Sequence, residues 1–81
     1  MTTPTASDLR LTWTVGVADE EYATATFGTS LALAVQPDRY SDGFAWTVEY
    51  VDRYDEGHVV FAGVEDTMIA AQLTAEYEAD R

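Results

Sequence analysis

Apolar and polar residues alternate along most of the chain before residue 65, and this alternation constrains the fold more than any other sequence feature. It is clearest over residues 9–17, where every second side chain is large and apolar: Leu9, Leu11, Trp13, Val15 and Val17. Side chains that alternate in this way point to opposite faces of a β-strand. Residues 9–17 are therefore predicted to form a half-buried strand.

Four further segments with strand character follow, at residues 22–27, 31–35, 44–50 and 58–64. Turn residues separate them. Gly28-Thr29 suits a two-residue type II′ hairpin turn, and the segments that precede residues 44 and 58 are rich in Asp, Gly and other loop formers. Because every connection is short, consecutive strands are expected to pair antiparallel in a meander.

The pattern changes near Asp66. Either Asp66 or Thr67 suits an N-cap, and the run from Met68 to Ala79 is rich in helix-forming residues without Gly or Pro. Its apolar residues at helical spacing form a stripe that is expected to face the sheet: Ile69, Ala70, Leu73 and Tyr77.

These segments predict an α+β fold, a small antiparallel β-meander of about five strands with one C-terminal α-helix packed on one sheet face. A chain of 81 residues has room for one hydrophobic core. Residues 1–8 are expected to be a flexible N-terminal arm and residues 9–81 a single domain. Among the expected core residues are Trp13, Leu33, Phe44, Trp46, Phe61 and Leu73.

Charge restricts the function more than the fold. Fifteen Asp and Glu residues stand against four arginines, with no lysine, and the net charge is -11. Contact with phosphate backbones or anionic lipids requires Lys or Arg, so neither direct nucleic-acid binding nor membrane binding is expected. The expected partner is a protein with a basic surface, and no oligomeric state is predicted. Without cysteine or a signal-like start, the chain is expected in the cytoplasm, or in the host cytoplasm if a phage encodes it.

No catalytic or metal-binding signature is present. Residues 38–43 with Glu49 partly match a calcium loop, but Tyr40 and Ala45 occupy two of its positions and strands flank it, so a hairpin connection is the better interpretation. His58 is the single histidine and lacks enough converging ligands for a metal site. Covalent catalysis has no candidate nucleophile. The sequence predicts no enzyme activity, no cofactor and no metal.

In a meander, successive turns alternate between the two ends of the sheet, and this sorts the acidic residues. One end is expected to hold Asp19, Glu20, Glu21, Asp38, Asp42, Glu65 and Asp66, and the other Asp8, Asp52, Asp55, Glu56, Glu76, Glu78 and Asp80. At the second end the acids face the negative end of the helix dipole, an arrangement that stability alone does not favour. The predicted partner-binding residues are Glu49, Asp52, Tyr54, Asp55, Glu56, Glu76, Glu78 and Asp80, with Tyr54 as an aromatic anchor for arginine.

Three functions compete. The first is an acidic inhibitor or adaptor that occupies a basic, nucleic-acid-binding surface of another protein; in size and charge the chain is similar to small anti-defence and host-takeover proteins of phages, some of which imitate DNA. The second is an interaction module, or a virion or complex subunit, that uses a sheet edge or a threonine-rich face: Thr12, Thr14, Thr24, Thr26 and Thr47. The third is a halophile domain whose acidic residues only solvate it.

Overall fold

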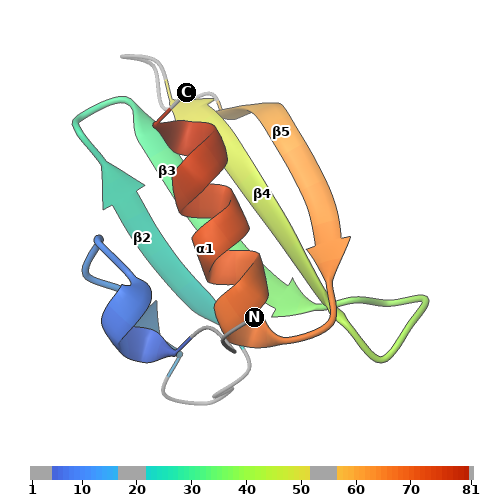
Figure 1. Cartoon of the computed structure of the whole chain (residues 1–81). Helices are drawn as coiled ribbons and strands as arrows, with labels where there is room; N and C mark the ends of the chain where they lie inside the picture. Colours follow the sequence, from blue (N-terminus) through green and yellow to red (C-terminus); the bar gives the residue numbers. More distant parts are fainter. Residues whose placement is uncertain (1–4, 17–21, 52–56, 81) are drawn as a thin grey trace.

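The fold is one antiparallel sheet with a helix on one face, as the sequence predicts (Figure 1). The computed structural model describes residues 5–16, 22–51 and 57–80. The five strands are hydrogen-bonded in sequence order, β1-β2-β3-β4-β5, and each pair is antiparallel. The elements are η1 (Ala6–Asp8), β1 (Thr14–Val15), β2 (Ala23–Phe27), β3 (Leu31–Pro37), β4 (Phe44–Val51), β5 (Gly57–Glu65) and α1 (Met68–Ala79).

The first strand is much shorter than the alternation predicts. β1 contains only Thr14 and Val15, both exposed, which pair with Thr24 and Ala23 of β2. Residues 9–13 lie outside the sheet, because the backbone N–H groups of Arg10 and Leu11 donate to a side chain of α1 instead of to a strand. The predicted strand is therefore wrong over residues 9–13 and at residue 16, and residue 17 lies outside the described residues.

The hairpin between β2 and β3 follows the sequence more closely. Gly28 has a φ of 65°, the left-handed region that a type II′ turn requires at its first central position. Phe27 pairs with Leu31, so the connection has three residues and not the predicted two.

The core lies between the helix and the centre of the sheet. Leu33, Val35 and Val48 are fully buried and form one cluster with Trp46 and two alanines of α1, Ala71 and Ala75. Trp13 is partly buried against this cluster. Leu33, Trp46 and Trp13 thus take their predicted places, whereas Leu73 is half-buried and lies outside the cluster.

The helix turns a different face to the sheet from the one its apolar stripe predicts. The buried residues of α1 are Ala71, Gln72, Ala75 and Glu76, while Tyr77 of the predicted stripe is 68% exposed. Alanines at 71 and 75 let the helix lie close to the large side chains of β3 and β4, and a close-packed core favours this fit. The predicted orientation is wrong because close packing and one buried carboxylate outweigh the apolarity of Ile69 and Leu73.

Trp46 occupies space that a glycine leaves open on the neighbouring strand. Trp46 pairs with Gly63 across β4 and β5, and a Cβ at residue 63 would lie 2.8 Å from the indole ring. Gly63→Ala is therefore expected to lower the free energy of unfolding by about 1–3 kcal/mol, because overpacking forces the ring off its position. Urea denaturation followed by tryptophan fluorescence measures the change.

Ala62→Val provides the control for this substitution, because Ala62 is exposed on the same strand. It is expected to change stability by less than about 0.5 kcal/mol. If Gly63→Ala were equally mild, the ring of Trp46 would have room that the structure does not show.

Candidate protein-binding surface

Glu76 is a buried carboxylate that holds the N-terminal segment on the helix. Its side chain is 7% exposed. Oε1 accepts a hydrogen bond from the backbone N–H of Arg10 at 2.9 Å. Oε2 accepts one from the backbone N–H of Leu11 at 2.9 Å and one from Trp13 Nε1 at 2.8 Å. Because these donors occupy the carboxylate, we remove Glu76 from the predicted partner-binding set and assign it a structural role.

The structure describes three of the other predicted contact residues, Glu49, Glu78 and Asp80. Glu49 lies half-buried on β4, paired with Val59 of β5. Glu78 and Asp80 lie at the end of α1, where Asp80 is the C-cap and donates its backbone N–H to the carbonyl oxygen of Glu76 at 3.1 Å. Four predicted contacts fall outside the described residues: Asp52, Tyr54, Asp55 and Glu56.

The described acidic residues gather at the two ends as the meander predicts. At the first end, Asp38 donates its backbone N–H to the carbonyl of Gly43, and the adjacent Phe44 pairs with Glu65. This brings Asp38 and Asp42 close to Glu65 and Asp66. At the second end, Asp8 and Asp80 line one hollow of about 480 Å³, whose apolar lining residues are Leu11, Phe27 and Leu73. Residues 19–21 lie outside the described residues.

The face of the sheet opposite the helix carries small side chains. Successive strand pairs join Thr14, Thr24, Ala34, Thr47 and Ala62 in one row across all five strands. A second row joins Thr26, Ala32, Glu49 and Val59. The predicted threonine-rich face therefore exists, and Thr12 adjoins it from the segment before β1.

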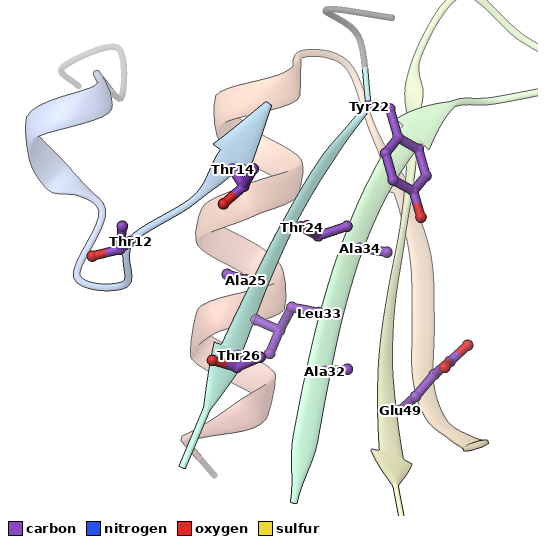
Figure 2. Close-up of a pocket in the computed structure, with 10 residues that line it drawn as sticks. All are labelled: Thr12, Thr14, Tyr22, Thr24, Ala25, Thr26, Ala32, Leu33, Ala34 and Glu49. Carbon is purple, nitrogen blue, oxygen red and sulfur yellow. The ribbon is translucent and has the colours of Figure 1, made fainter. Parts of the chain in front are cut away.

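A shallow hollow of about 350 Å³ lies on this open face (Figure 2). Threonine hydroxyls and alanine methyl groups form most of its lining, with Tyr22 and Glu49 as its two titratable side chains. Such a surface suits contact with a flat protein face better than it suits acid–base chemistry, which needs a positioned acid and base.

Strand β5 exposes more apolar surface than the sequence predicts. Val59, Val60, Phe61 and Val64 are all exposed, and no charged residue stands among them. Among the strands of the described residues, β5 pairs with β4 alone, so no described strand lies along its other edge. Phe61 was predicted to be inside, but it lies on this edge strand and stays 40% exposed. The signal was available, since the last strand of a meander is an edge strand.

Two further findings concern the chemistry of the described residues. Within residues 5–16, 22–51 and 57–80, His, Asp and Glu side chains nowhere gather in threes at a position that suits a metal ion. Within the same ranges, no helix has the length and apolarity that crossing a membrane requires.

Comparison of the chain with protein-family models, with curated proteins and with solved structures finds no match.

Proposed function

We propose that this chain is a small acidic protein-binding domain, an inhibitor or adaptor that occupies a basic surface of a partner protein. The observation that carries the proposal is the exposed apolar strip Val59, Val60, Phe61 and Val64 on β5, together with the acidic residues around it. Large apolar side chains exposed along an edge strand, with polar residues around them, are typical of sites where proteins bind.

Acidic residues flank this strip in the sequence and on the neighbouring strand. In the sequence, Asp55 and Glu56 directly precede β5, and Glu65 and Asp66 follow the strip. On the neighbouring strand, Glu49 pairs with Val59. Carboxylates around an apolar centre favour a partner whose contact surface has an apolar centre and Arg or Lys around it.

The net charge of -11 extends this preference beyond the contact itself. A strongly negative domain attracts a basic partner at long range and speeds association, and salt weakens the attraction. Basic surfaces of this kind commonly bind nucleic acid. Occupying such a surface excludes the nucleic acid, which is how an acidic domain acts as an inhibitor.

Charge reversal at two places in the sequence tests the proposal. Asp55→Lys/Glu56→Lys changes two carboxylates next to β5, and Glu20→Lys/Glu21→Lys changes net charge by the same amount elsewhere in the sequence. Immobilised wild-type chain is expected to capture a basic protein from lysate of the source organism at about 50 mM salt and to lose it near 500 mM. The first variant is expected to lose capture and the second to retain most of it.

Two controls are added to the capture experiment. Lysozyme added to the lysate reports unspecific capture of basic proteins, and duplex DNA added to the captured partner reports competition for the same surface. Capture of lysozyme in equal measure, or equal losses in both variants, would show a diffuse field without a site. No salt-dependent capture at all would contradict the proposal and leave the acidic residues a solvation role.

A second candidate function rests on the open face of the sheet. The helix covers one face only, and the other presents the threonine and alanine rows and their hollow (Figure 2). An interaction module or complex subunit of this kind would bind through shape and hydroxyl groups. Capture that persists at high salt and in both charge-reversed variants favours this function over the first.

A further inference from the structure

The two edges of the sheet differ greatly in what they offer to another chain. At one edge β1 has only two residues. At the other edge β5 has nine residues, from Gly57 to Glu65. A strand at the edge of a sheet leaves a row of backbone N–H and C=O groups unpaired, and a longer strand offers a longer row. β5 is therefore the edge on which a further strand gains the most hydrogen bonds.

β5 also lacks most of the devices that protect an edge strand. Between His58 and Val64 it contains no proline and no charged side chain, although exposed edges usually carry lysine or proline. The single irregularity is a register shift, where Glu49 pairs with Val59 and Val48 with Phe61 so that Val60 has no partner on β4. One bulge interrupts the pairing but leaves the strand open on both sides of it.

Exposed side chains on both faces of β5 extend the contact beyond the backbone. Val59 and Val64 share the open face with Glu49 and Ala45, their partners on β4. Phe61 shares the helix-side face with Val48. An added strand has alternate side chains on the two faces, so apolar residues at every second position pack either beside Phe61 or beside the valines, as its register decides.

The acidic residues near β5 determine which kind of strand can pair with it. Glu65 and Asp66 stand at one end of the apolar run and Glu49 beside its other half. A second copy of this chain would bring the same carboxylates and a further charge of -11 to the contact, which like-charge repulsion disfavours. An extended segment that carries Arg or Lys at its ends instead neutralises these residues.

We infer that the free edge of β5 binds an extended segment of the partner as a sixth strand, with apolar side chains in its centre and basic residues at its ends. This inference rests on the proposed function and specifies how the partner is held. Main-chain hydrogen bonds supply the pairing, the exposed valines and Phe61 supply packing, and the carboxylates select basic ends.

A labelled peptide, Arg-Lys-Val-Thr-Val-Thr-Val-Lys-Arg, is the probe, and fluorescence anisotropy at low salt measures its affinity for the full chain. Replacing both threonines of the peptide by proline keeps the charge but removes backbone N–H groups. Exchanging the basic ends for Glu and Asp keeps the backbone and reverses the charge. Each change is expected to weaken binding by about tenfold or more.

Two protein variants place the same charge on the two edges. Val60 of β5 is 48% exposed and Val15 of β1 is 47% exposed. Val60→Lys is expected to weaken peptide binding about tenfold and Val15→Lys less than about twofold, because a charge on an edge blocks strand pairing there. Hydrogen exchange on the wild-type chain is an independent measurement, in which the peptide is expected to slow exchange of β5 amides and not of β1 amides.

Each contrary outcome contradicts either this inference alone or the proposed function as well. Equal binding of the proline peptide would show a contact by charge alone, which ends the inference but leaves the proposed function. Binding of none of the basic peptides at low salt would contradict both. If sedimentation shows a dimer of the free chain that Val60→Lys converts to a monomer, the occupant of β5 is a second copy and not a basic segment.

Discussion

Glu76→Gln is expected to lower the free energy of unfolding by about 2–4 kcal/mol. The carboxylate accepts hydrogen bonds from two backbone N–H groups and the indole of Trp13. An amide has one acceptor oxygen, and its NH₂ group is itself a donor, so at least one of the three N–H groups would face another donor. Bonds to a charged acceptor contribute more than neutral ones, and a donor left buried without a partner carries its desolvation cost.

Urea denaturation measures this loss. Glu49→Gln is the matched control, because it removes the same charge from a side chain on the open face of the sheet. The control is expected to change stability by less than about 0.5 kcal/mol. Amide hydrogen exchange identifies the cause of the loss. Faster exchange of the Arg10 and Leu11 amides in Glu76→Gln shows that the N-terminal segment is released from the helix. Equal stability of both variants would mean that this segment contributes nothing to folding.

Leu33→Ala is expected to cost about 2–5 kcal/mol, because Leu33 is fully buried at the centre of the core and its truncation leaves a cavity. Leu73→Ala removes the same atoms from the helix, at a half-buried position that lines the hollow beside Leu11 and Phe27. Its expected cost is about 1 kcal/mol, since that side chain is only partly buried and its truncation leaves no enclosed cavity.

The difference between the two leucines tests the orientation of the helix. Thermal or urea denaturation of both variants under the same conditions gives the ratio of their losses in the free energy of unfolding. A cost for Leu73→Ala equal to that for Leu33→Ala would support the apolar stripe that the sequence predicts and would contradict the buried face formed by Ala71 and Ala75.

The sequence predicts only part of the candidate protein-binding surface. Acidic residues are sorted by the order of the turns, so the grouping of Asp38 with Glu65 followed from the meander alone. Glu76 was misplaced, because nothing in its sequence neighbourhood distinguishes it from Glu78 or Asp80. The apolar pattern does not predict the exposure of Val59 and Phe61, because it shows which residues share a face and not whether another element covers it; the place of β5 as the last strand of the meander is the signal that does.

The sequence by itself determined the type and order of the four strands β2 to β5 and of the helix α1. Alternation over β2 to β5, Gly28 in its turn and the uninterrupted run of helix formers from Met68 are local signals, and local backbone preferences act before the chain folds. Only the tertiary structure decided how far β1 extends and which face α1 buries. Both depend on where the backbone N–H groups of Arg10 and Leu11 find an acceptor, and that acceptor, Glu76, lies more than sixty residues away along the chain. Most buried backbone N–H groups in proteins are paired, and such long-range pairing leaves no periodic trace in the sequence.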